Sequence, residues 1–259
     1  GAAGTTVIGQ IIAAILALVF NLKCNRELNI SMKGFRPNGY LIVQIYKVGA
    51  PSIVVQAIGS LMTYGMNLIL AAFGSAQTVF GIYFKLQSFV FMPVFGLNNG
   101  MVPIIAYNYG AGHKDRVIKT IKHSVAYGVG IMFVGLLAMH IFPAQLMRMF
   151  DAEESLIAIG APALETISLS FVFAGFCIVA GSVFQALGNG VYSMIVSVAR
   201  QMCVLLPVAK LLSLSGEVTL IWWAFPIAEL ASVLLTSYFL VRIYRKVICH
   251  IGEPVVQDA

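Results

Sequence analysis

The sequence has little charge for its length. Asp, Glu, Lys and Arg make up 10% of the 259 residues, whereas hydrophobic residues make up 59%. Ordinary soluble domains are about 25% charged and about 45–50% apolar. So few charges cannot cover the surface of a soluble protein of this size. The composition therefore excludes a water-soluble fold and indicates that the chain lies in a lipid bilayer.

The motifs of enzyme chemistry are also absent from the sequence. It contains no HExxH zinc motif, no GxSxG nucleophile elbow and no P-loop. Its four histidines are scattered over predicted loops and helix ends, and its four cysteines show neither a CxxC pair nor a metal-ligand spacing. We therefore expect neither an enzyme, a disulfide framework nor a bound metal or other cofactor.

Long hydrophobic runs, in contrast, fill most of the sequence. A helix that crosses the bilayer needs about 20 predominantly apolar residues. By that measure the chain contains seven runs, which are separated by Gly, Pro and Ser. They cover approximately residues 1–22, 48–73, 78–107, 117–142, 156–187, 191–214 and 218–244.

These runs predict an all-α, polytopic membrane protein with seven transmembrane helices. The predicted parts are a first helix at residues 1–22, a polar linker at 23–46, a six-helix bundle at 47–246 and a tail at 247–259. The chain opens Gly1-Ala-Ala-Gly, without an initiator Met or the pattern of a signal peptide, so the first helix starts at once. We therefore expect a fragment whose N-terminal part is absent.

The basic residues gather on one predicted side of the membrane. If the seven helices alternate in direction, twelve of the sixteen Lys and Arg residues lie on the side of the linker and the tail. Only Arg148 and Lys210 lie on the other side. By the positive-inside rule we expect the linker and the C-terminus to be cytoplasmic, in a plasma (inner) membrane. Because topology explains most of the net charge of +6, no nucleic-acid partner is expected.

Four ionisable residues remain within the hydrophobic runs, namely Lys85, Glu165, Arg200 and Glu229. A charge at the bilayer centre costs about 2.5–3.5 kcal/mol on insertion scales, so such residues normally face a bundle interior or an aqueous cavity. Residue counting places Lys85 and Glu165 at similar depth and Arg200 and Glu229 near mid-membrane, which makes the two basic residues the expected partners of the two acids. Two interpretations stay open: ion pairs that orient helices, or glutamates that carry a proton or attract a cation during transport.

Neutral polar and aromatic side chains within the runs are candidates for a substrate cavity. Such side chains bind lipophilic cations through cation–π contacts and hydrogen bonds. The residues selected on this basis are Gln56, Tyr64, Asn67 and Gln87. Contacts with lipid or with neighbouring helices explain the same residues, so both roles stay open.

Three segments of the sequence carry a resemblance to a known family. They are Met92-Pro-Val-Phe-Gly-Leu-Asn-Asn-Gly-Met-Val-Pro103, continuing to Tyr107-Asn-Tyr-Gly-Ala-Gly112; Phe184-Gln-Ala-Leu-Gly188; and Gly1-Ala-Ala-Gly-Thr-Thr-Val-Ile-Gly-Gln10. Together these segments resemble the multidrug and toxic compound extrusion (MATE) family, in its bacterial efflux branch. Their order and spacing are similar to the second half of that family. The resemblance implies helix six, the linker between two six-helix lobes, and the six helices of the C-lobe. It also implies a missing N-terminal lobe, without which the chain is expected to be inactive.

The resemblance further implies antiport by alternating access, in which inward Na⁺ or H⁺ movement drives the export of lipophilic or cationic drugs. The sodium-driven branch uses acids in helices seven and ten, yet residues 48–73 contain no Asp or Glu and Phe173-Ala174 occupies the helix-ten region. The coupling ion therefore stays open, with Glu165 and Glu229 as cation-coupling candidates and Lys85 and Arg200 as their partners. The alternatives are a lipid or polysaccharide flippase of the same superfamily and, from another class, a seven-helix receptor or structural membrane subunit.

Overall fold

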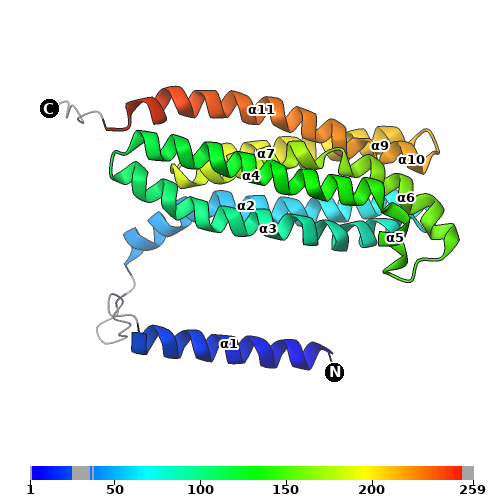
Figure 1. The fold of residues 1–259 in the computed structure, drawn as a ribbon, viewed down its shortest axis with the longest axis horizontal. Helices are drawn as coiled ribbons and strands as arrows, with labels where there is room; N and C mark the ends of the chain where they lie inside the picture. Colours follow the sequence, from blue (N-terminus) through cyan, green and yellow to red (C-terminus); the bar gives the residue numbers. More distant parts are fainter. Residues whose placement is uncertain (1, 25–35, 37, 253–259) are drawn as a thin grey trace. The chain divides into compact units, whose positions relative to one another are not determined.

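In the computed structural model, residues 2–24, 36 and 38–252 are described, and all their regular secondary structure is helical (Figure 1). The chain divides into two compact units, residues 1–45 and 46–259. Each unit is described by itself. Residues 25–35 and 37 of the predicted linker, and residues 253–259 of the predicted tail, lie outside the described residues.

The first unit contains helix α1, which runs over Ala2–Cys24. The predicted first helix is thus present, and its sequence has no proline to interrupt it. Its apolar stretch within the described residues, Val7–Lys23, is shorter than the about 20 residues of a full crossing.

The second unit contains the predicted bundle. Five helices are long and apolar enough to cross a membrane, and a sixth crossing is made if the bent pair α6–α7 counts as one span. These spans coincide with the last six hydrophobic runs, which confirms the all-helical membrane fold. Helix α2 (Gly39–Leu70) begins in the first unit and continues into the second. The elements that follow it are η1 (Ala71–Phe73), α3 (Ala76–Gly110), α4 (Lys114–Ile141), α5 (Pro143–Arg148), α6 (Glu154–Ser168), α7 (Phe171–Ala186), α8 (Gly190–Val198), η2 (Ala199–Leu205), α9 (Leu206–Ser213), α10 (Val218–Ile221), α11 (Ala224–Lys246) and η3 (Ile248–His250).

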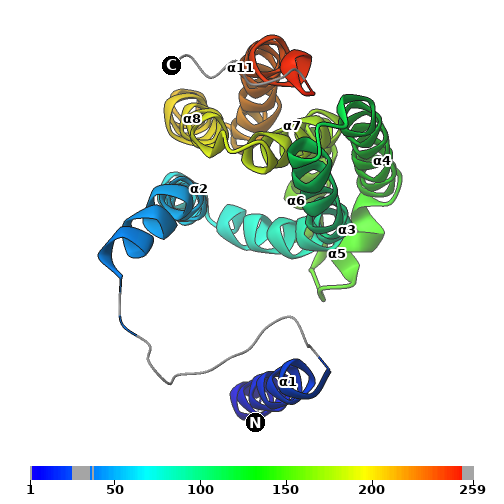
Figure 2. The ribbon, with the colours of Figure 1, turned by 90° about the vertical axis from the view of Figure 1, so that its left-hand side faces the viewer.

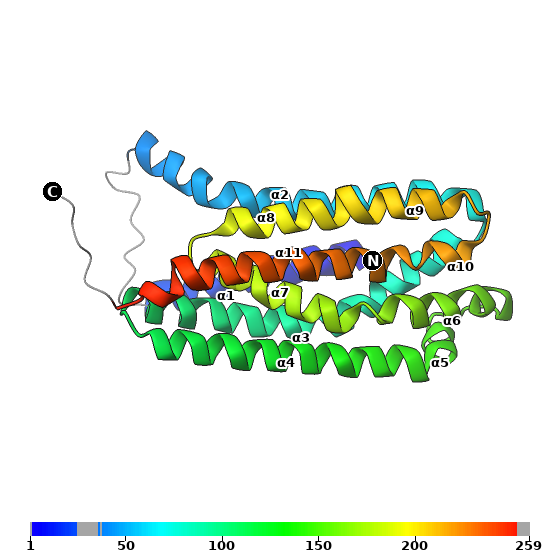
Figure 3. The same ribbon diagram turned by 90° about the horizontal axis from the view of Figure 1, so that it is seen from above.

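Glycines end the helices where the sequence predicts breaks. Gly112 and Gly188 follow α3 and α7 with φ of 74° and 76°, a left-handed conformation that glycine adopts without steric cost. The short turns that result hold successive spans antiparallel and side by side (Figure 3). The turn chemistry therefore fixes the order of the helices in the bundle.

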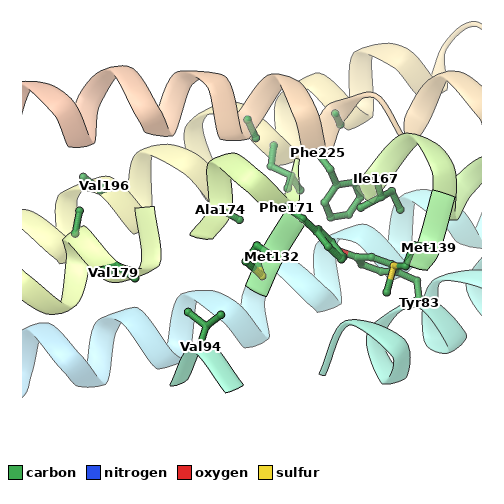
Figure 4. Packing of buried hydrophobic residues seen from close by; sticks show 14 of the residues in the cluster. Tyr83, Val94, Met132, Met139, Ile167, Phe171, Ala174, Val179, Val196 and Phe225 are labelled. Carbon is green, nitrogen blue, oxygen red and sulfur yellow. The ribbon is translucent and has the colours of Figure 1, made fainter. Parts of the chain in front are cut away.

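The apolar core lies where α4 and α7 pack against each other and against α3. Figure 4 shows Met132 of α4, Ala174 of α7 and Val94 of α3 within this one cluster. The helices approach closely because glycines meet there, with the position of a Cβ on Gly175 lying only 3.0 Å from the backbone oxygen of Gly128. Small residues thus seal this side of the bundle.

Two spans depart from regular α-helix. The α6–α7 span bends by 49° at Leu169-Ser170. The span from Gly190 to Ser213 contains the π-helical segment Ala199–Leu205. Buried positions along that span follow helical steps of three or four except for a step of five across the π-helical segment; they are Ser193, Val196, Gln201, Leu205 and Ala209.

Candidate functional site

A cavity of about 670 Å³ lies within the second unit, between α2, α3, α7, the α8–η2 span and α11. Seen along the helices, α2 and α8 stand on one side of α7 and α11, and α3 and α4 on the other (Figure 2). The volume is within the range of about 300–1,000 Å³ typical of small-molecule sites. Its polar lining residues are Ser52, Gln56, Gln87, Asn98, Asn99, Ser170, Ser182, Gln185, Ser193, Ser197, Arg200, Gln201, Glu229, Ser232 and Thr236.

Aromatic rings form much of the apolar cavity wall, beside aliphatic side chains such as Ile178. Tyr83 of α3 and Phe225 of α11 stack edge to face, with ring centroids 5.8 Å apart. Phe91 of α3 packs edge to face on Phe171 of α7 at 5.4 Å. Aromatic faces attract cations and also accept flat apolar molecules. The wall therefore suits a ligand that is both lipophilic and positively charged.

One ion pair lies at this cavity, between Arg200 of the π-helical segment and Glu229 of α11. The Arg200 side chain is 28% exposed and that of Glu229 is 8% exposed. The other ion pair among the described residues, Arg148–Glu154, lies at the surface with both side chains more than half exposed. A π-helical turn inside a span is frequently found at a functional site, and this one carries the only cationic side chain that lines the cavity in the described part of the bundle.

Two buried polar atoms at the cavity, Glu229 Oε2 of α11 and Asn98 Oδ1 of α3, have no hydrogen-bond partner within the described protein. The hydroxyl groups of Ser232 and Thr236 lie on the same face of α11 as Glu229, beside the Cys177 thiol, which is a weak hydrogen-bond partner. An unpaired buried polar group costs about 1–3 kcal/mol. Such a cluster beside an open volume indicates a place where water or a ligand supplies the missing partners.

Four of the predicted residues line the cavity, namely Gln56, Gln87, Arg200 and Glu229. The structure also brings Arg200 and Glu229 together, as residue counting from the membrane surface predicts for two side chains near mid-depth. Their role in coupling stays a proposal.

The two other cavity candidates, Tyr64 and Asn67, lie outside the lining. Tyr64 is 65% exposed on the surface of α2. Asn67 donates from Nδ2 to the backbone oxygen of Thr63, one turn earlier in the same helix, at 2.9 Å. Both residues follow Met62, the last position of α2 that reaches the cavity. The polarity of Tyr64 and Asn67 indicated neither which face of α2 they lie on nor how far they lie from the cavity along the helix.

The expected pairing of Lys85 with Glu165 is wrong. The two side chains form no ion pair within the described chain, and Lys85 Nζ lies instead over the Phe150 ring, 5.6 Å from its centroid. Glu165 is half-buried and does not line the cavity. Similar depth in the membrane does not make two residues neighbours, because depth leaves the direction around each helix undetermined.

Sequence reasoning missed the polar face of α11. Glu229, Ser232 and Thr236 are spaced by three and four residues, which puts them on one side of a helix. This spacing was present in the sequence as a polar stripe through an apolar run. The bend before α7 and the π-helical segment, by contrast, left no clear signal in the apolar pattern.

Comparison with known proteins agrees with this architecture. The sequence model of the MatE family matches residues 51–211. The multidrug export protein MepA of Staphylococcus aureus (strain N315) is 27% identical over 231 residues, which cover 88% of this chain and 51% of that protein. MepA of Staphylococcus haemolyticus (strain JCSC1435) is 26% identical, with 95% and 54% covered.

Solved structures extend the likeness to the fold. The MATE multidrug transporter DinF-BH, solved in complex with a ligand, superposes with a TM-score of 0.82 at 32% identity, covering 96% of this chain and 56% of its own. A transporter of the MOP superfamily from Pyrococcus furiosus gives a TM-score of 0.84 at 20% identity, which speaks for the fold alone. The chain spans about half the length of the curated relatives it matches.

Proposed function

Because this chain belongs to the MatE family of multi-pass membrane transporters, we propose that it forms the C-terminal lobe and preceding helix of a secondary active multidrug exporter. In this proposal, lipophilic or cationic compounds leave the cell in exchange for inward movement of a cation. The observation that carries the proposal is the Arg200–Glu229 pair at the wall of a large aromatic cavity.

The lining of the cavity supports this class of substrate. Rings such as Phe91 and Phe225 offer apolar and π-rich surface, and neutral groups such as Gln56 and Gln87 offer hydrogen bonds without a fixed charge. Glu229 is the acid in the lining, and its Oε2 has no protein partner among the described residues. The cavity thus offers a lipophilic cation both an apolar wall and a negatively charged hydrogen-bond acceptor.

The ion pair supports a way to couple substrate to cation. With Glu229 ionised, its charge balances that of Arg200. When Glu229 takes up a proton, or binds Na⁺ through Oε2, the cavity gains one positive charge and repels a cationic substrate. Cation and drug then exclude each other, which is the requirement for antiport. We place coupling at Glu229 rather than at the other predicted candidate, Glu165, because Glu165 does not line the cavity.

Two further features of the proposal concern the chain as a whole. Transport by alternating access needs a second lobe against which the bundle rocks, and the length of the relatives supports such a partner. The gathering of basic residues beside the linker and tail supports a cytoplasmic position for both.

The test is rhodamine-dye export from cells that produce the chain together with its second lobe. We expect Glu229→Gln to abolish gradient-driven export while the amount of protein in the membrane stays unchanged. Imposed H⁺ and Na⁺ gradients, applied separately to membrane vesicles, identify the ion. Glu165→Gln is the matched control because it removes the same charge outside the cavity, and it should leave export intact. Normal export by Glu229→Gln, or loss of export with Glu165→Gln alone, contradicts the assignment.

A further inference from the structure

A second hollow lies on the bundle, between α3 and α4. Its volume is about 480 Å³, and it shares no lining residue with the central cavity within the described bundle. The floor comes mainly from α3, through residues such as Gly96, Gly100 and Ile104, and the other wall comes from α4, through Lys119, His123 and Tyr127. The hollow therefore needs an explanation of its own.

The floor is open because of two glycines. Gly96 and Gly100 are four residues apart, so they lie on the same face of α3. A Cβ placed on either glycine meets no described atom within 4 Å. One turn of α3 therefore has no side chains on this face, and no neighbouring side chain occupies the space that they would fill. The result is an apolar groove rather than a helix contact.

The rim at one end of the groove is basic. Lys119 and His123 are four residues apart on the exposed side of α4. His123 Nδ1 lies 2.7 Å from the backbone oxygen of Lys119, and because a carbonyl only accepts, this nitrogen carries the hydrogen and donates it. Nε2 is thus the ring nitrogen left for a ligand, and it donates a hydrogen bond to a phosphate oxygen when the ring is in its imidazolium form. No Asp or Glu occurs among the residues lining the groove in the described part of the chain.

The polarity of the groove changes along its length. Helix α4 begins at Lys114, so with a rise of 1.5 Å per residue Lys119 lies about 8 Å into the helix and Tyr127 about 20 Å. The basic rim therefore stands near the membrane surface, and the glycine floor extends toward the hydrocarbon core. A phospholipid has the same gradient, from a charged phosphate to an acyl chain.

We infer that the groove between α3 and α4 binds an anionic phospholipid. The phosphate lies against Lys119 and His123, and one acyl chain lies along Gly96 and Gly100. The bound lipid contacts the same stretch of α3 whose other side lines the central cavity through Asn98. The inference rests on charge complementarity and groove shape, so it holds whether or not the chain exports drugs.

The test is native mass spectrometry of the purified chain in detergent, with phosphatidylglycerol and phosphatidylcholine of identical acyl chains as probes. We expect one phosphatidylglycerol to be retained in preference to phosphatidylcholine. Lys119→Gln should weaken that preference about fivefold, the effect of about 1 kcal/mol per basic residue at a lipid surface. The double variant Lys119→Gln/His123→Gln should weaken it further. Gly100→Leu, which fills the floor, should lower the retention of both lipids.

Two matched variants keep the result specific. Lys122→Gln removes a neighbouring exposed charge that does not line the groove, and Gly130→Leu adds the same side chain to α4 at an open position elsewhere. Both should bind lipid like the parent chain. Because the Lys119 and His123 changes lie at the exposed rim, they test the inference even where Gly100→Leu fails to fold.

Three outcomes overturn the inference. The first is equal retention of the two lipids, or an equal loss in the Lys122→Gln control. Displacement of the lipid by free glycerol phosphate at millimolar concentration is the second, since it assigns the rim to soluble phosphates. The third is loss of the lipid when the second lobe is added, which makes the groove a contact between lobes.

Discussion

The two sides of the bundle are built by different rules. Where α3, α4 and α7 pack against one another, glycines bring backbones close together and buried Met, Val and Phe side chains fill the remaining space. On the opposite side, where α3 and α7 face α2, the π-helical segment and α11, a cavity of about 670 Å³ separates the helices, and buried polar atoms lack partners among the described residues. The close packing of the first side stabilises the fold. The second side carries buried polar groups without hydrogen-bond partners, which a ligand or a cation can supply. Stability and function are therefore separable here by position, and four sets of substitutions test that separation.

The largest expected effect is that of removing one member of the ion pair. Arg200→Met leaves Glu229 buried and unpaired, a change that costs about 3–5 kcal/mol in buried pairs. Since the Arg200 side chain is 28% exposed, we expect the lower end of that range, about 3 kcal/mol. Thermal unfolding in detergent measures the loss.

The double variant Arg200→Met/Glu229→Leu is its control. Because no unpaired charge remains, stability should return to nearly that of the parent chain, while dye export should stay lost. A double variant as unstable as the single one shows that the ion pair stabilises the cavity side, which contradicts the division between the two sides.

The next effect concerns helix packing on the sealed side. A Cβ on Gly175 would lie 2.9 Å from Met132 Cγ and 3.0 Å from Gly128 O, so Gly175→Ala should destabilise the chain by about 1–3 kcal/mol through overpacking. Gly130→Ala, at an open position of α4, should instead stabilise it by about 0.5–1 kcal/mol through helix propensity. Unfolding midpoints of the two variants in the same detergent provide the comparison, and shifts of the same sign contradict it.

A smaller effect on stability is expected along the polar face of α11. Ser232→Ala/Thr236→Val removes two hydroxyl groups that lie beside the Cys177 thiol. Because a thiol is a weak hydrogen-bond partner, stability should change by less than about 1 kcal/mol. Export should nevertheless slow down, because the groups that solvate the path beside Glu229 are gone. Ser237→Ala, on the same helix but outside the cavity lining, is the control. A large loss of stability with unchanged export reverses the proposed division.

The smallest effect is expected at Lys85, on the outside of both regions. Its contact with the Phe150 ring is worth about 0.5–1 kcal/mol at an exposed site. Lys85→Gln and Phe150→Leu, measured singly and together, give the coupling energy from unfolding. Export should be unchanged in each variant. Loss of export with Lys85→Gln would contradict this expectation and show that Lys85 takes part in transport.

The sequence predicts where the spans begin and end, but not which face of each span points to the cavity. Hydrophobic runs bounded by residues such as Gly112 and Gly188 predict where the six helices of the bundle begin and end, because length and turn chemistry are local properties. The Arg200–Glu229 pair was also within reach, since both residues lie near mid-span.

The sequence does not predict which side of its helix a residue such as Lys85 or Tyr64 faces. That direction depends on the packing of distant segments, and bends and π-helical turns shift it further along a span. Asn98 and Ser170 entered the site for the same reason, through the arrangement of α3 and α7 rather than through any local pattern.

The π-helical segment also determines how the number of residues in this span can change during evolution. Relative to a continuous α-helix, the segment acts as an inserted residue, so α9 is turned by about 100° with respect to α8. Deleting one residue of the segment would turn the step of five between Val196 and Gln201 into the four of an α-helix, so the ladder of hydrogen bonds would heal while Leu205 and Ala209 keep their side of the span. What such a deletion would remove is the π-helical geometry around Arg200, so the span can lose one residue without losing its packing but not without disturbing the ion pair with Glu229.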